Sequence, residues 1–404
     1  MSKVIVIGAG PAGMMAAITA GNKNHEVILL DGNEKVGKKL FITGKGRCNV
    51  TNAKDISEFF DYIPGNPHFL YSALYTYTNE DTMKLFSDAN IKLKVERGGR
   101  VFPNSDKSSD IIKGLSLTLD KANVTVLLKH KVKDIVIENN KIKSVIIENG
   151  KVIKGDYFII ATGGASYPLT GSNGDGHKFA KKVGHNIIPL KPSLVPIELE
   201  EPWIKDLSKL NLRNISASII EGKKIVYKNQ GELLFTNFGV SGPIILKGSR
   251  YVKEGQYILS LDLKPALDEK ALDNRVIRDF QKYINKEFKD SLNDLLPAKL
   301  IPIIISLSNI PKNKKVNEIT KTERKNLVYL IKHFNMHIKG LRSLQEAIVT
   351  SGGVDTLEID PSTMKSKIID NLSFAGEVMD VDAFTGGYNV QIALSTGFIA
   401  GDNI

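Results

Sequence analysis

Apolar and polar positions in the first thirty residues follow the order strand, turn, helix, strand. Val4 to Ile7 form a continuous apolar run, which is typical of a strand buried on both faces. Glycines at positions 8, 10 and 13 interrupt this pattern, and the stretch MMAAITAGNK that follows them predicts a helix. The next run, HEVILLD, predicts a second strand that ends in Asp31. The pattern therefore predicts a βαβ unit at the start of an α/β fold.

A turn with the spacing G-x-G-x-x-G is suited to a dinucleotide. Its first glycine makes the turn, its second lets the backbone approach a diphosphate, and its third lets helix and strand pack closely. Asp31 has nearly the spacing expected of an acid that binds the adenosine ribose, which favours FAD or NAD over NADP. The residues assigned to cofactor binding here are Gly8, Gly10, Pro11, Ala12, Gly13 and Asp31.

Residues 122–164 favour FAD over NAD. The segment alternates apolar and polar residues, has turn signals at ENN and ENG, and returns to a buried strand, YFIIATGG. This order resembles the FAD domain of glutathione-reductase-like flavoproteins, in which the meander forms the crossover. The resemblance implies that backbone near Val132 holds the adenine, and that Thr162 and Gly163 belong to a second glycine motif passing the dinucleotide.

The C-terminal segment LSFAGEVMDVDAFTGGYNVQIALSTGFIAG predicts a strand, an acidic loop and a helix. The amide donors at the N-terminus of such a helix can stabilise negative charge on a reduced flavin. The residues assigned to cofactor binding in this segment are Gly376, Glu377, Asp382, Gly387, Asn389 and Val390.

Over nearly its whole length the chain resembles the bacterial HI0933-like flavoproteins, also described as the BaiN-like or aminoacetone-oxidase family of FAD-dependent oxidoreductases. The motifs are GKKLFITGKGRCNVTN at 37–52, GGRVFPNSDKSSDI at 98–111, ATGGASYPLTGSNGDGH at 161–177, GELLFTNFGVSGPIIL at 231–246, VTSGGV at 349–354 and GEVMDVDAFTGGYN at 376–389. The resemblance implies FAD as the cofactor. It also implies a glutathione-reductase-like Rossmann FAD domain with an inserted domain, partly β-barrel-like and partly helical.

The polar stretch FITGKGRCNVTN at 41–52 predicts a loop, which the resemblance places along the flavin. Lys38 and Lys39, with Arg47, would offset the diphosphate charge, while Gly44 and Asn49 would lie at the ring or ribityl chain. Cys48 has three interpretations: a packing residue, a proton donor to a substrate carbon, or a covalent flavin attachment. Arg47 beside it would lower its pKa and support proton transfer, so Cys48 and Arg47 are the catalytic candidates.

The FAD-binding domain is expected over 1–195 and 346–404, with a substrate domain inserted at 196–345. Within the insertion, 196–265 and 336–345 have β-rich patterns with turns at EGKK and KNQG, and 266–335 has helical spacing. The candidates for lining a substrate site are Arg100, Phe102, Tyr167, His177 and residues 236–241.

Composition adds a local charge imbalance. The net charge is +11, and by count about +9 of it lies in residues 196–345 and about +7 in 311–342. Such a block favours an anionic partner, with Lys314 and Lys315 as contacts, although a solvated lysine-rich face has the same composition. A single cysteine excludes a disulfide framework and fits a reducing compartment. No signal peptide or membrane span is predicted, so a cytoplasmic protein is expected. No metal site is expected either.

These observations leave three functions open. The first is a reductase that passes hydride from flavin N5 to a polarised C=C; the basic block favours a uracil base in ribosomal RNA over a bile-acid or other steroid ring. The second is an aminoacetone-type amine oxidase that uses oxygen. The third is an RNA- or protein-binding module with a structural flavin. The chain has no second G-x-G-x-x-G, which argues against a resident NAD(P)H domain but not against transient NAD(P)H binding.

Overall fold

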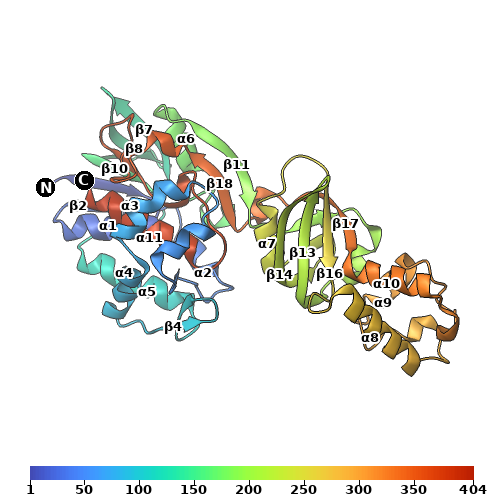
Figure 1. Ribbon diagram of the computed structural model, residues 1–404. Coiled ribbons are helices and arrows are strands. Elements are labelled where there is room, and N and C mark those ends of the chain that lie inside the picture. The colour runs from blue at the N-terminus through green and yellow to red at the C-terminus, as the bar shows by residue number, and fades with distance from the viewer. The chain divides into compact units, whose positions relative to one another are not determined.

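The computed structural model describes all 404 residues, which form two compact units (Figure 1). Unit 1 comprises residues 1–193 and 344–404, and unit 2 comprises residues 194–343. Each unit has its own cluster of buried apolar side chains.

A five-stranded parallel sheet forms the centre of unit 1. Its strands, in spatial order, are β19 (Leu372–Phe374), β10 (Tyr157–Ile160), β1 (Lys3–Ile7), β2 (Glu26–Leu30) and β6 (Thr125–Leu127). Val4, Ile5 and Val6 of β1 are fully buried, as expected for a strand covered on both faces. The predicted α/β class is confirmed, and the carboxyl ends of these parallel strands share one edge of the sheet.

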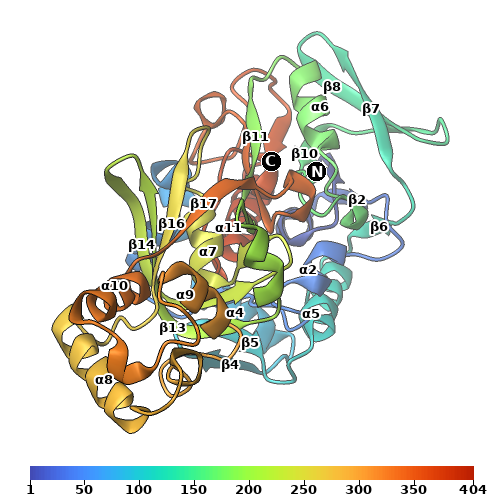
Figure 2. The ribbon, with the colours of Figure 1, turned by 90° about the vertical axis from the view of Figure 1, so that its right-hand side faces the viewer.

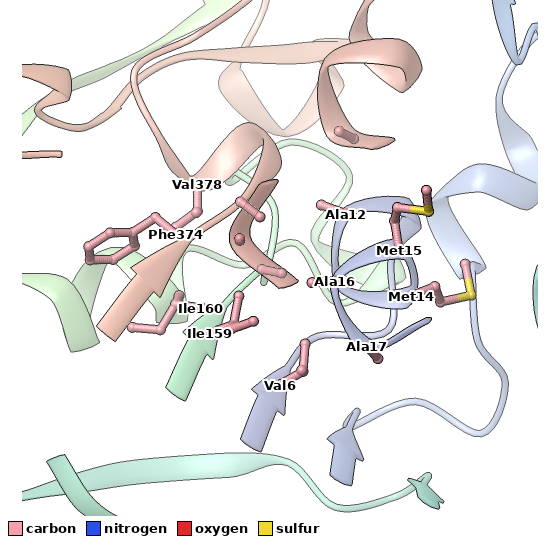
Figure 3. Close-up of a cluster of buried hydrophobic side chains, with 14 of the residues drawn as sticks. Val6, Ala12, Met14, Met15, Ala16, Ala17, Ile159, Ile160, Phe374 and Val378 are labelled. Carbon is pink, nitrogen blue, oxygen red and sulfur yellow. The ribbon is translucent and has the colours of Figure 1, made fainter. Parts of the chain in front are cut away.

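Helix α1 (Pro11–Asn22) packs against the C-terminal helix α11 (Tyr388–Asp402). Their backbones come close, because a Cβ at Gly397 would lie only 2.3 Å from the carbonyl oxygen of Ala12. Figure 3 shows Ala16 and Ala17 of α1, Val6 of β1 and Ile159 and Ile160 of β10 within the same buried cluster. The other helices of unit 1 are α2 (Lys38–Ile42), α3 (Tyr71–Thr76), α4 (Asn79–Asp88), α5 (Ser108–Lys121) and α6 (Asp175–Lys182).

Three smaller antiparallel sheets complete unit 1. The meander consists of β7 (Val132–Glu138), β8 (Lys141–Ile147) and β9 (Val152–Lys154). A second sheet contains β3 (Thr51–Asn52), β5 (Arg100–Pro103) and β4 (Leu93–Glu96). The third pairs β11 (Ile187–Ser193) with β18 (Val349–Val354). Asn139 and Asn140 both have positive φ at the β7–β8 turn, where the ENN signal falls.

Unit 2 contains a closed six-stranded barrel (Figure 2). The strands around the barrel are β12 (Ile197–Leu199), β15 (Gly239–Ser241), β14 (Lys224–Phe235), β13 (Asn211–Glu221), β16 (Tyr257–Asp262) and β17 (Phe334–Leu341). Helix α7 (Pro243–Ser249) packs on β14. Buried and exposed residues alternate along most of β17, as barrel strands require.

One predicted turn is wrong. EGKK does form the β13–β14 turn, but KNQG at 228–231 lies inside the continuous strand β14. Gly231 has a different reason to be glycine, because a Cβ there would lie 2.7 Å from a methyl carbon of Ile244 in α7. The glycine marks a close helix crossing and not a chain reversal.

A helical part follows the barrel strand β16 and consists of α8 (Glu269–Lys282), α9 (Ile301–Leu307) and α10 (Lys321–Lys332). Helices α8 and α10 lie side by side in both views (Figures 1 and 2). Thr320 and Glu323 form a capping box at the start of α10, and Leu327, Val328 and Ile331 form its buried face. None of the helices has the length and apolar character that crossing a bilayer requires.

Candidate active site

The turn after β1 has the geometry of a diphosphate-binding loop. Gly8 has φ +105°, and a Cβ at Gly13 would lie 1.8 Å from the carbonyl oxygen of Gly8. A Cβ at Gly10 would meet no protein atom within 4 Å, so the backbone there is accessible to a ligand. Helix α1 starts immediately afterwards at Pro11 without a side-chain cap, which leaves the amides of Ala12 and Gly13 directed out of its N-terminus.

Asp31 fixes this turn at the carboxyl end of β2. Its carboxylate accepts hydrogen bonds from the amide of Ala9 (2.7 Å) and from the amide and side chain of Asn33 (2.7 and 2.9 Å). The carbonyl of Ala9 in turn accepts from the amide of Gly37 (2.8 Å). Asp31, the acid predicted to bind the adenosine ribose, therefore also holds the chain in the conformation that the glycine turn needs.

Strand β3, at the end of the loop after α2, lies against the N-terminus of α11. The amide of the Asn52 side chain donates to the carbonyl of Gly386 (2.9 Å), and a Cβ at Gly387 would lie 2.2 Å from the carbonyl oxygen of Thr51. Thr51 also donates to the side chain of Gln391 (2.6 Å) within α11. The structure thus brings together the 37–52 and 376–389 motifs, which are more than 300 residues apart in sequence.

Helix α11 begins without a side-chain cap, since its N-cap residue is Gly387 with φ +97°. The amides of its first turn, which include Asn389 and Val390, are therefore available to an anionic or electron-rich group. The side chain of Asn389 is used within the protein, because it donates to the carbonyl of Ala383 (2.6 Å) and accepts from its amide (2.9 Å). Asp382 is buried and accepts from the hydroxyl of Ser193 (2.8 Å).

Glu377 connects helix α2, strand β18 and the loop after β10 in unit 1. Its carboxylate accepts from the ammonium group of Lys39 (2.8 Å), the hydroxyl of Ser166 (3.3 Å) and the amide of Thr350 (2.8 Å). Lys39 also donates to Ser166 (2.7 Å), and the Thr350 hydroxyl accepts from the amide of Ala165 (2.8 Å). Sequence reasoning selected Lys39 and Glu377 but missed Ser166 and Thr350, whose roles depend on tertiary pairing.

Two buried polar atoms in these segments, Oδ1 of Asn49 and Oγ1 of Thr162, have no hydrogen-bond partner in the protein, and the ring nitrogens of His177 have none of good geometry, with the backbone of Val378 nearby. Thr162 lies against the start of α6, because a Cβ at Gly176 would be 2.0 Å from its hydroxyl. Buried polar atoms are rarely left unpaired in proteins. Together with the accessible Gly10 and the uncapped amides of α1 and α11, these atoms fit a large polar ligand such as FAD.

The remaining cofactor candidates occupy the same segments. Gly44 and Gly163 both have positive φ, Val132 is buried at the start of β7, and Lys38 is exposed, with its ammonium 3.3 Å from the Asn33 side chain.

A family description, the HI0933-like protein Rossmann domain, matches residues 2–403 of the chain. The chain belongs to this family. It is 32% identical over 400 residues to the ribosomal RNA dihydrouridine synthase of Escherichia coli, with 99% of this chain and 97% of the relative covered. It is 29% identical over 414 residues to the 3-dehydro-bile acid delta(4,6)-reductase of Clostridium scindens, with 99% and 98% covered.

A solved structure with a similar fold is the 3-ketosteroid-delta4-(5alpha)-dehydrogenase from Rhodococcus jostii RHA1 in complex with 4-androstene-3,17-dione. The TM-score is 0.50 at 14% identity, with 100% of this chain and 95% of the other covered, a likeness that concerns the fold alone. The family resemblance found in the sequence is confirmed, and the protein is an FAD-dependent oxidoreductase of the HI0933-like family.

In this HI0933-like protein, Cys48 is fully buried and has φ +57°, an uncommon conformation for a residue with a side chain. Burial raises the pKa of its thiol to about 12. The expectation that Arg47 lowers this pKa is wrong, because burial dominates and the guanidinium is paired with Glu96 and Asp106. Arg47 also stacks over Phe102, with 4.2 Å from its central carbon to the ring centroid.

The substrate candidates differ in exposure. Arg100 and Tyr167 are exposed, whereas Phe102 and His177 are buried inside unit 1. Burial lowers the pKa of His177, which keeps its ring neutral. In unit 2, the segment 236–241 forms the turn into β15, where the Thr236 hydroxyl accepts from the amide of Gly239 (3.1 Å).

The two predicted RNA contacts also differ. Lys314 forms an ion pair with Glu323 (2.7 Å), whereas the neighbouring Lys315 is exposed.

Proposed function

We propose that this HI0933-like enzyme reduces a C=C bond conjugated to a carbonyl group, and that its substrate is a uracil base of ribosomal RNA. The observation that carries the first part is the pair of relatives, since a dihydrouridine synthase and a bile-acid reductase both saturate a ring double bond and both match nearly the whole chain. FAD, when bound, supplies the hydride for this reduction.

The residues of the protein would position the flavin and supply a proton. The uncapped amides at the start of α11 would offset negative charge on the reduced ring. The Lys39–Glu377–Thr350 network would hold the surrounding loops in place. We assign Cys48 the role of proton donor toward the second carbon of the substrate, because it lies in the 37–52 motif expected along the flavin; the raised pKa of its buried thiol makes it a weaker acid than an exposed cysteine. Such a step requires no metal ligand and no serine or carboxylate nucleophile.

The charge of unit 2 favours RNA over a steroid. By count, about +9 of the net charge of +11 falls in residues 194–343. Neutralising phosphates releases counterions, a gain that a neutral steroid ring cannot provide. We therefore assign binding of the RNA backbone to unit 2 and place the enzyme in the cytoplasm with its RNA. A base in folded RNA would have to be unstacked before it could react. We propose NAD(P)H as a reductant that binds transiently, because the one G-x-G-x-x-G of the chain is assigned to FAD and no second motif offers a resident NAD(P)H site.

The deciding experiment is anaerobic reoxidation of the reduced enzyme, followed by flavin absorbance. Unmodified ribosomal RNA transcript, DNA of the same sequence and a conjugated 3-ketosteroid are added separately. We expect reoxidation with the RNA alone, together with a mass gain of two hydrogens on a uracil. Reoxidation by the steroid and not by RNA would identify a small-molecule ene reductase instead. Rapid reoxidation only after admission of air, with peroxide release from an amine, would identify an oxidase.

A further inference from the structure

Two separate segments of unit 2 are joined at its helical end. The amide of Phe288 donates to the carbonyl of Lys314 (2.8 Å), and the amide of Val316 donates to the carbonyl of Lys286 (3.1 Å). The loop at 311–316 is therefore fixed along the segment at 286–289. Lysines from both segments consequently share one surface.

Some basic residues of this region are structural. Lys314 binds Glu323 (2.7 Å), which also caps α10 through the amide of Thr320 (2.7 Å). Arg324 binds Asp273 (2.7 Å) and thereby connects α10 to α8. The charges of these basic residues are matched by carboxylates, so they hold the helices together and add little to the outward field.

Five other lysines are exposed and have no carboxylate within 4 Å. This group, called the lysine face below, consists of Lys286, Lys312 and Lys315 on the two joined segments and Lys321 and Lys325 on the first turns of α10, which the Lys314–Glu323 ion pair connects to the 311–316 loop. Three acids lie in the same segments: Asp290 and Glu318 are exposed, and Glu287 pairs with Lys289 (2.7 Å) opposite Lys315, so the lysines remain in excess. Lys321 occupies the first turn of α10, where a cation opposes the helix dipole, so helix stability does not account for it.

We propose that the lysine face binds the phosphate backbone of the RNA substrate, an inference that rests on the proposed function. The capped helix α10 and the two hydrogen-bonded segments form a rigid frame, so RNA binding costs this part of the protein little conformational entropy. Lysine ammonium groups act as point charges and do not offer the planar fork with which arginine recognises guanine. The lysine face would therefore determine affinity and orientation, while the choice of base would depend on other residues.

The test is the salt dependence of RNA binding by the FAD-loaded enzyme. The variant Lys321→Gln/Lys325→Gln removes two charges from one side of α10. The matched control is Lys113→Gln/Lys121→Gln, two exposed lysines of α5 in unit 1 that also lack an ion pair. A ribosomal RNA fragment is titrated at several KCl concentrations. We expect the slope of log K against log salt to fall by roughly 0.7 to 0.9 for each lysine removed from α10, and to stay unchanged in the control.

A wild-type slope in the α10 variant, or an equal loss in the control, would overturn the proposal. Flavin content and melting temperature are measured for both variants, so that misfolding is recognised. Lys315→Gln provides a second variant outside the helix, with an expected loss of one such increment. The proposed function fails separately: RNA that binds through the lysine face without reoxidising the flavin contradicts base reduction, while supporting the binding surface.

Discussion

At the scale of single residues, Lys314 and Lys315 illustrate what tertiary structure adds. The two lysines are neighbours in one basic block, and nothing in the sequence around them distinguishes one from the other. The structure pairs Lys314 with Glu323 and leaves Lys315 exposed. Arg47 is a similar case, because its partner Glu96 is distant in sequence. Residue types and motifs could be predicted from the sequence, but the pairing of each charge depends on chain crossings that local patterns do not encode.

Cys48 offers a direct test of proton transfer. A thiol is protonated at neutral pH in any case, and burial raises the pKa of Cys48 further, so the rate of the reaction and not the pKa must decide this role. We expect Cys48→Ala to retain FAD and to slow RNA-dependent flavin reoxidation by on the order of a hundredfold or more, the usual contribution of a general acid. Single-turnover absorbance measurements would show this. Cys48→Ser keeps the size of the side chain and removes the thiol, so it separates loss of the proton donor from loss of packing. A packing role would instead lower the melting temperature of the Ala variant and leave the rate intact.

His177 is expected to contribute to the pH dependence of stability. Burial lowers its pKa, so the unfolded chain takes up a proton, below about pH 6.5, more readily than the folded protein. Its contribution to stability is therefore present above that pH and is lost as the pH falls. The slope can reach about 1.4 kcal/mol per pH unit. Urea unfolding of the FAD-loaded protein between pH 5 and 7.5 should show a flatter dependence for His177→Gln; an identical dependence would contradict the assignment.

At the scale of elements, the strands and helices with a clear period were predictable. The run at Val4–Ile7 became β1, and the glycine turn and helix followed it as expected. KNQG did not form a turn, because Gly231 accommodates the crossing of α7 over a twelve-residue strand. A glycine required by local conformation and a glycine required by a distant helix look alike in sequence.

Two glycines, Gly397 in α11 and Gly10 before α1, are expected to respond differently to replacement by alanine. Gly397→Ala would place a Cβ 2.3 Å from the Ala12 carbonyl oxygen and push the helices apart, so we expect a loss of about 1 to 3 kcal/mol in stability. Gly10→Ala meets no protein atom within 4 Å, and its stability should change by less than about 1 kcal/mol. Its FAD content should nevertheless fall, because the new methyl group occupies the approach to the turn. Denaturant unfolding and flavin absorbance measure the two effects. Full FAD retention by Gly10→Ala would refute the diphosphate assignment.

At the scale of the whole molecule, the chain contains two hydrophobic cores that have no residue in common. The candidate flavin residues all belong to unit 1, whereas the basic excess belongs to unit 2. A ligand that binds only the folded form of one unit stabilises that unit by mass action. Cofactor binding and RNA binding are therefore expected to stabilise different parts of the protein.

The single tryptophan allows this to be measured. Trp203 belongs to unit 2, where it packs against Phe334 with 5.4 Å between ring centroids, so its fluorescence reports unfolding of that unit. Release of flavin reports unfolding of unit 1. We expect added FAD to raise the flavin-release midpoint while the tryptophan midpoint stays constant, and a ribosomal RNA fragment to raise the tryptophan midpoint. If FAD moved both midpoints equally, the units would unfold as one cooperative body. In that case cofactor and substrate binding would have to be treated as coupled, since a ligand on either unit would stabilise the other.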